Sequence, residues 1–219
     1  IGVFAFFIEK FYTMNKTQHH QKNLFAAIID NKFEDIIKYK AFYNKLFFGY
    51  HPLELAIIRN NDPVFLVMFN RIKSDLSSNQ LVKLLKSAID SNNIDIFKVL
   101  VNLALKTERG FLFVSGPILK KEDIKEIMEY TIKSNKEEFF RVLLKQESIN
   151  LNKDSDLSNA ILKYTYLYSK IEMLFLLLQK GCLTNKKTIS CDDQDTRKDD
   201  IINKYGFYKE INEKELKDE

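Results

Sequence analysis

Apolar residues recur along the 219-residue chain at offsets of three and four, in pairs of short segments joined by a polar turn. Such offsets place the apolar side chains of each segment on one face of an α-helix. The clearest pair is LLKSAIDSNNIDIFKVL at residues 84–100, which has Asn92 and Asn93 near its centre. We therefore predict two amphipathic helices here, packed against each other across an asparagine turn.

The same pair of segments recurs about five times when one small residue of the first segment serves as an anchor. The anchors are Ala27, Ala56, Ala88, Thr131 and Thr165. They are about 29, 32, 43 and 34 residues apart, which is in the range of helical repeats. Positions three before and one, nine and twelve after each anchor are apolar or aromatic. Burying such a stripe is worth roughly 1.5–3 kcal/mol per large side chain, so we predict helix pairs that share a core.

A turn-forming residue stands four positions after each anchor. These residues are Asn31, Asn60, Asn92, Asn135 and Ser169. Asn adopts the left-handed backbone conformation at lower cost than most residues. We therefore predict a tight helix–turn–helix connection in every unit.

Two stretches resemble the ankyrin repeat. PLELAIIRNNDPVFLVMF (residues 52–69) is similar to its T-P-L-H opening, first helix, turn and second helix, and LLLQKGCLTN (residues 176–185) is similar to its end. The chain departs from the family pattern because His51 and Glu54 replace the Thr and His, and Asn or Ser replaces the turn Gly. The resemblance covers residues 24–185 and implies an all-α solenoid of about five to six stacked repeats that binds a protein or peptide. Another α-solenoid is the structural alternative.

The repeats suggest three regions. Residues 1–22 form an N-terminal extension or capping helix, residues 23–189 the repeat array, and residues 190–219 a polar loop with C-terminal capping helices. The N-terminal sequence IGVFAFFIEKFYT has an apolar run of about eight residues, too short to cross a bilayer, and lacks the features of a signal peptide. We expect it to cap the first repeat; the alternative is the remnant of a membrane anchor.

Composition and charge narrow the functional classes. Six Gly and three Pro are too few for the turns of a β-sandwich. The 34 basic and 30 acidic residues are interspersed, with a net charge of +4 and no recognised nucleic-acid motif, so no nucleic-acid binding is expected. Cys182 and Cys191 make no disulfide framework and suit a reducing compartment. We predict a cytoplasmic monomer; degenerate ankyrin-like units also resemble secreted bacterial effectors that act inside a host cell.

The histidines provide no evident metal site. His19 and His20 lie in a polar stretch with no further ligand at useful spacing. His51 precedes Pro52, where its ring can accept a hydrogen bond from the first amides of a helix. We therefore expect no metal and no other cofactor.

Catalysis has no clear signature either. Ser115, Cys182 and Cys191 have no base at a recognisable spacing. The chain is therefore predicted not to be an enzyme. The alternative is an effector enzyme whose site is assembled in space, for example from His51, Glu54 and Arg59.

Aromatic residues are concentrated in two connecting segments, KAFYNKLFFGY (residues 40–50) and the β-prone FLFVS between glycines at residues 110–116. Connecting segments are usually polar, so these aromatics either pack between units or contact a partner. The second segment is expected to form a finger or hairpin. We predict that a protein partner binds the concave face and the inter-repeat loops through Phe42, Tyr43, Phe47, Phe48, Tyr50, Arg59, Phe111 and Phe113.

Overall fold

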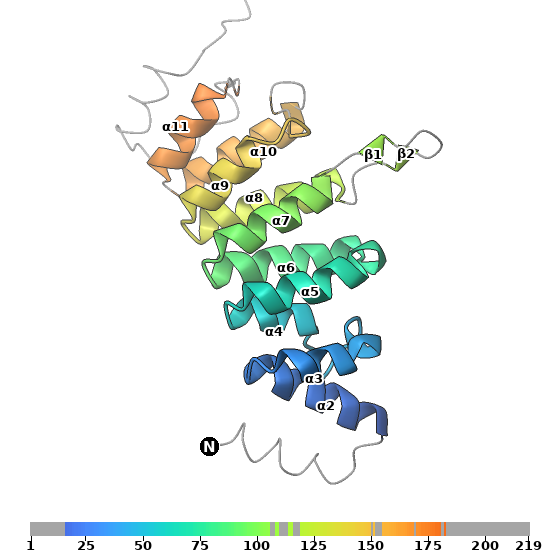
Figure 1. Cartoon of the computed structure of the whole chain (residues 1–219). Helices are drawn as coiled ribbons and strands as arrows, with labels where there is room; N and C mark the ends of the chain where they lie inside the picture. The colour runs from blue at the N-terminus through green and yellow to red at the C-terminus, as the bar shows by residue number, and fades with distance from the viewer. Residues whose placement is uncertain are drawn as a thin grey trace, which may run out of the picture. The chain divides into compact units, whose positions relative to one another are not determined.

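The computed structural model describes residues 16–105, 108–109, 114–115, 119–149, 151, 155–168, 170–180 and 182. The chain divides into two compact units, residues 1–96 and 97–219, and the boundary falls within α7. The described part of the chain is all-α, as predicted, apart from one short β-hairpin and an isolated β-bridge (Figure 1).

Helices of the first unit are α2 (Lys16–Ile29), α3 (Phe33–Lys38), η1 (Lys40–Phe42), α4 (Pro52–Ile58), α5 (Asp62–Ile72), η2 (Lys73–Asp75) and α6 (Ser78–Asp90). Helix α7 (Ile94–Leu105) leads into the second unit, which contains α8 (Lys121–Lys133), α9 (Glu137–Leu144), α10 (Ser155–Leu167) and α11 (Ile171–Gln179). None of the helices within these described residues is both long and apolar enough to cross a bilayer.

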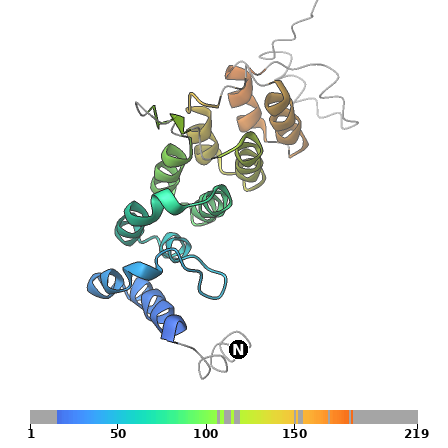
Figure 2. The same ribbon diagram turned by 90° about the vertical axis from the view of Figure 1, so that its right-hand side faces the viewer.

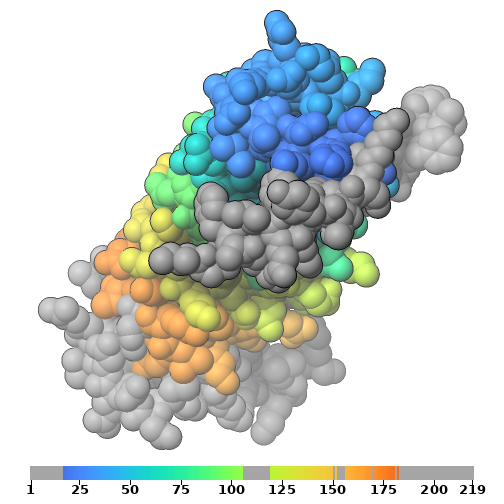
Figure 3. All heavy atoms as spheres, turned by 90° about the horizontal axis from the view of Figure 1, so that it is seen from below, coloured from blue at the N-terminus to red at the C-terminus, as the bar shows by residue number. Residues whose placement is uncertain are grey.

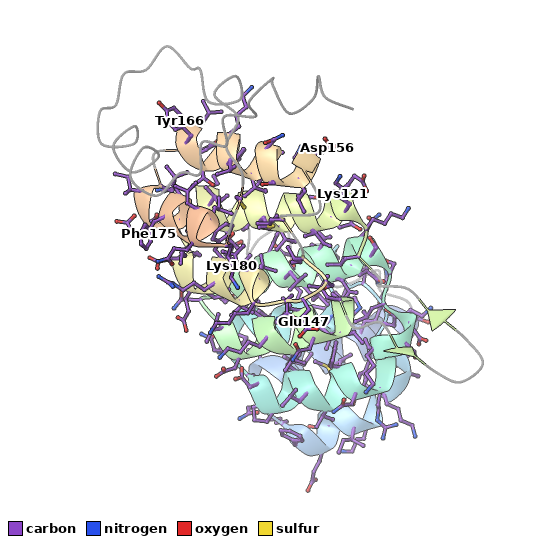
Figure 4. The ribbon with its side chains drawn as sticks, turned by 90° about the horizontal axis from the view of Figure 1, so that it is seen from above. Lys121, Glu147, Asp156, Tyr166, Phe175 and Lys180 are labelled. Carbon is purple, nitrogen blue, oxygen red and sulfur yellow. The ribbon has the colours of Figure 1, made fainter. Side chains whose placement is uncertain are left out.

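Helices within each unit pack in pairs. In the first unit, α2 packs against α3 and α4, and α4 packs against α5 and α6 (Figure 2). In the second unit, α8 packs against α9 and α10, and α11 packs against α9 and α10. An exposed ion pair of 3.8 Å joins Lys121 and Asp156 where α8 and α10 begin (Figure 4). Within the units, α2, α4 and α8 therefore each contact the second helix of their own pair and the first helix of the next pair.

Four connections within these pairs have the same backbone geometry. Asn31, Asn60, Asn92 and Asn135 have φ values of 58°, 51°, 55° and 55°. In each case the next amide donates a 2.9 Å hydrogen bond to the carbonyl oxygen of the anchor residue, and the Asn amide donates to the residue after the anchor. This pair of bonds is a Schellman motif. The left-handed turn is thus confirmed at these four positions, whereas Ser169 lies outside the described residues.

The anchor side chains are buried in all five repeats. Thr131 and Thr165 replace Ala at little cost because each hydroxyl donates a 2.7 Å hydrogen bond to a carbonyl oxygen of its own helix. The predicted apolar positions are also buried, with the single exception of Tyr39, which is half-buried. Tyr39 differs because α3 is short and ends at Lys38, so that Tyr39 is its C-cap.

Polar side chains connect consecutive turns of the first unit. The Asn61 amide donates to Asn31 Oδ1 at 3.0 Å, and the Asn93 amide donates to Asp62 Oδ1 at 2.7 Å. Asn61 and Asn93 also cap α5 and α7, because their Oδ1 atoms accept from Val64 N and Ile96 N. Neighbouring pairs are therefore held at their turns as well as through the apolar core.

The hairpin predicted between the third and fourth repeats is present. Strands β1 (Glu108–Arg109) and β2 (Val114–Ser115) pair antiparallel. Phe111 and Phe113 lie outside the described residues. Helix α2 crosses the predicted boundary at residue 22, while residues 190–219 are not among those described.

Candidate functional site

The connection between η1 and α4 ends in a second, tighter hairpin. Phe47 N donates to Tyr50 O at 2.9 Å, and Tyr50 N donates to Phe47 O at 3.1 Å. Phe48 and Gly49 between them have φ values of 51° and 82°. Positive φ at both central residues is required by the type I′ turn, which matches the natural twist of paired strands. We call residues 43–50 the finger. This name does not refer to the hairpin formed by β1 and β2.

Buried and half-buried contacts fix the base of the finger. Tyr43 is fully buried, and its hydroxyl donates to Ile36 O at 3.0 Å. Burial raises the pKa of Tyr43, so the phenol stays protonated and keeps this bond. On the α2 side, the Gln21 amide donates to Leu46 O at 3.0 Å, and the rings of Phe25 and Phe47 lie 5.1 Å apart. Helix α2 and the segment that follows it, both coloured blue, adjoin on one face of the first unit (Figure 3).

The other side of the finger is held by α6. Lys83 Nζ donates to Gly49 O at 3.1 Å and lies 5.8 Å from the centre of the Tyr50 ring, within the range of a cation–π contact. The Gln80 amide donates to Asn44 Oδ1 at 3.4 Å. The finger is therefore bonded to the helices before and after it in the sequence.

The tip of the finger carries exposed apolar surface. Leu46, Phe48 and Tyr50 are 56%, 37% and 51% exposed. Phe48 also has a left-handed backbone, which costs a residue with a side chain roughly 1–2 kcal/mol. Such strain persists only where the surrounding contacts impose it, and it occurs preferentially at functional positions. Exposed apolar side chains on a strained, firmly held turn make this tip the candidate site.

A buried polar network lies behind the finger at the start of α4. His51 Nδ1 accepts from Leu53 N at 3.2 Å, and His51 N donates to Glu54 Oε2 at 3.4 Å, which completes a capping box. His51 Nε2 faces Asn44 Oδ1 at 3.2 Å. The predicted capping role of His51 is thus confirmed. Because Nδ1 accepts a hydrogen bond, the ring is the neutral tautomer with its proton on Nε2.

Glu54 links this network to α6. Its Oε2 lies 2.9 Å from Lys83 Nζ, and its Oε1 accepts from Ser87 Oγ at 3.4 Å. Burial lowers the pKa of His51 to about 4; the Lys83 charge acts in the same direction and the Glu54 charge opposes it. The ring is therefore uncharged at neutral pH, and both its nitrogens are engaged. This arrangement stabilises structure and leaves His51 poorly placed to act as a base.

The hypothetical group of His51, Glu54 and Arg59 is only partly assembled. His51 and Glu54 do meet, but the cation that pairs with Glu54 is Lys83. Arg59 is instead the exposed C-cap at the other end of α4. Burial raises the pKa of the Cys182 thiol, which disfavours the reactive thiolate. Within the described ranges, no three His, Cys, Asp or Glu side chains are grouped so that they could hold a metal ion.

The aromatics predicted to contact a partner fall into different environments. Phe48 and Tyr50 are exposed, whereas Phe42 and Phe47 are half-buried, and Phe42 stacks on His20. Tyr43 is completely buried, because its hydroxyl is used inside the unit; it supports the finger and is not part of its surface. Leu46, which is not among the predicted contacts, is the most exposed apolar side chain of the tip.

Comparison with protein-family models, with characterised proteins and with solved structures finds no match to this chain.

Proposed function

We propose that this chain is a protein-binding scaffold of about five to six stacked ankyrin-like helix pairs, with the finger as its main contact for a protein partner. The observation that carries the proposal is the exposure of Leu46, Phe48 and Tyr50 on a turn whose base is fixed by buried contacts. Aromatic side chains are enriched at protein interfaces and supply much of their binding energy. A preformed tip also lowers the entropic cost of binding.

The recurring Asn turns and the contacts between successive first helices support the stacked arrangement within each unit. Repeats of this kind expose connecting segments and first helices as an extended surface. Arg59, at the end of α4, belongs to the proposed surface, and Phe111 and Phe113 are retained as proposed contacts. We further propose that the chain acts as a monomer in a reducing cytoplasm, either that of its own cell or that of a host cell.

The alternative is an effector enzyme whose site is assembled in space. The polar group nearest to such a site is the network of His51, Glu54 and Lys83. Its histidine is 3% exposed, and both ring nitrogens have polar partners. Binding is therefore the better supported of the two functions.

Photocrosslinking from the finger tests the proposal. A benzophenone amino acid is placed at position 48 in one full-length protein and at position 66 in another. The matched position is Leu66 on α5, because its side chain is 40% exposed and that of Phe48 is 37%. After irradiation in a cell lysate, we expect a discrete protein adduct from position 48 and none from position 66. Adducts from position 66 alone, or identical adducts from both, would remove the finger from the interface.

A further inference from the structure

Apart from the first turn of α3, which carries Glu34 and Asp35, the segments that hold the finger contain many cations and only one carboxylate. Helix α2 and residues 36–53 and 76–89 include no Asp or Glu at all. The exception is Glu54 in α4, whose side chain is 8% exposed and is paired with Lys83. The lysines in these segments whose side chains are described are Lys22, Lys38, Lys40, Lys45, Lys83 and Lys86. Of these, Lys38 is paired with Asp35 at 2.7 Å.

The remaining carboxylates of the first unit lie in other places, as far as its described residues extend. They occur at the turns, on α3, α5, η2 and α7, and at the end of α6. These residues are Asp30, Glu34, Asp35, Asp62, Asp75, Asp90 and Asp95. The interspersed charges of the sequence are therefore partly sorted in space: α2, the finger and residues 76–89 carry lysines and no carboxylate, although the whole chain carries a net charge of only +4.

We infer that the finger binds an acidic protein segment that also carries a large apolar side chain. The inference rests on the proposed function and specifies the partner's chemistry. Electrostatic complementarity favours a negatively charged segment beside Lys45 and Lys83 and accelerates its association. The partner also needs an apolar side chain, because covering the exposed apolar surface of Leu46, Phe48 and Tyr50 is favourable when an apolar group replaces the water.

Lys83 is suited to receive a carboxylate of this partner. An ammonium group has three donors, and Glu54 Oε2 and Gly49 O accept two of them at 2.9 and 3.1 Å. A partner carboxylate that accepts the third donor would meet a lysine already fixed in position. Lys45 is exposed immediately before Leu46, so a second carboxylate would lie next to the apolar contact.

The same geometry favours a protein segment over single-stranded nucleic acid or a membrane. Binding of single strands requires open aromatic faces on which bases stack. Here the Lys83 ammonium group lies over the Tyr50 ring, and the Phe48 ring packs against Phe47 with 4.3 Å between centres. Insertion into a bilayer uses a broad apolar face, whereas this tip offers three partly exposed side chains.

Selection from a random library of displayed peptides, each about 12 residues long, tests the inference on the full-length chain. Peptides that also bind the Phe48→Asn variant are discarded, so that only finger-dependent sequences remain. We expect these sequences to be enriched in Asp and Glu beside Leu, Phe or Trp. A synthetic representative should lose at least about tenfold in affinity for Lys45→Glu, because like charges then face each other.

The matched control is Lys163→Glu, the same charge reversal at an exposed position on α10 of the second unit. It should change the affinity by less than about twofold. Finger-dependent peptides that are neutral or basic would overturn the acidic partner and leave the proposed function standing. If no finger-dependent peptide is recovered, or if a single-stranded oligonucleotide or phosphatidylserine vesicles bind in its place through Lys45 and Phe48, both proposals fail.

Discussion

When the pH is lowered from about 7 to about 4, we expect the free energy of unfolding of the wild-type protein to fall by about 3 kcal/mol more than that of a His51→Asn variant. The reason is the lowered pKa of His51 in the folded chain, about 4, against an ordinary value of 6.5. Between these values the unfolded chain binds a proton that the folded chain does not. The stability associated with the neutral ring is thus complete above pH 6.5 and is lost as the pH falls towards 4.

The structure explains why protonation is unfavourable. A proton on Nδ1 would break the hydrogen bond from Leu53 N, and the charge would be buried beside Lys83, only partly balanced by Glu54. Asn is a suitable replacement because its side chain also accepts a hydrogen bond at the N-cap but does not titrate.

Urea denaturation followed by circular dichroism at several pH values measures this difference, since the chain has no tryptophan. The many carboxylates also titrate in this range, but they are common to both proteins and cancel in the comparison. If the two proteins lose equal free energy between pH 7 and pH 4, the neutral buried ring is contradicted.

Replacing Glu54 by Ala is expected to lower the free energy of unfolding by about 2–3 kcal/mol. The change removes the ion pair with Lys83, the bond from Ser87 Oγ and one half of the capping box. It also releases Lys83, whose ammonium holds Gly49 O. We therefore expect faster hydrogen exchange at the Tyr50 amide, which closes the hairpin by donating to Phe47 O.

The matched control is Glu137→Ala on α9. Glu137 also pairs with a cation, at 2.6 Å from Arg141, but both side chains are well exposed. Its removal should cost less than about 1 kcal/mol, because exposed ion pairs contribute little. Equal losses for the two variants, or unchanged exchange at Tyr50 in Glu54→Ala, would disconnect the buried network from the finger.

The helix pairs could be predicted because their determinants are local and repeat. The left-handed Asn and the small anchor stand at fixed offsets within one Schellman motif, so the sequence pattern and the hydrogen-bond pattern coincide. Tyr39 departs from the pattern because α3 ends one residue before it. Local rules thus explain both the agreement and this exception.

The finger and its support could not be predicted in the same way. Type I′ turns favour Asn-Gly, and Phe48 is a poor residue for the left-handed position, so Gly49 was the main local signal. The contacts from Lys83 to Glu54 and Gly49 join elements far apart in the sequence, and no periodicity reports them. For Tyr43, an aromatic in a connecting segment gave no sign that its hydroxyl bonds Ile36 O within the unit.

The most direct measurement compares binding and stability in the Phe48→Asn variant. The affinity of the protein cross-linked from position 48 is measured for wild type, Phe48→Asn and Leu66→Asn, together with the melting temperature of each. We expect Phe48→Asn to lose at least about 30-fold in affinity, as a central aromatic contact would, while its melting temperature stays the same or rises because Asn tolerates the left-handed turn. Leu66→Asn should bind as wild type does. Unchanged affinity in Phe48→Asn, or a loss that appears only with unfolding, would contradict the finger as the binding site.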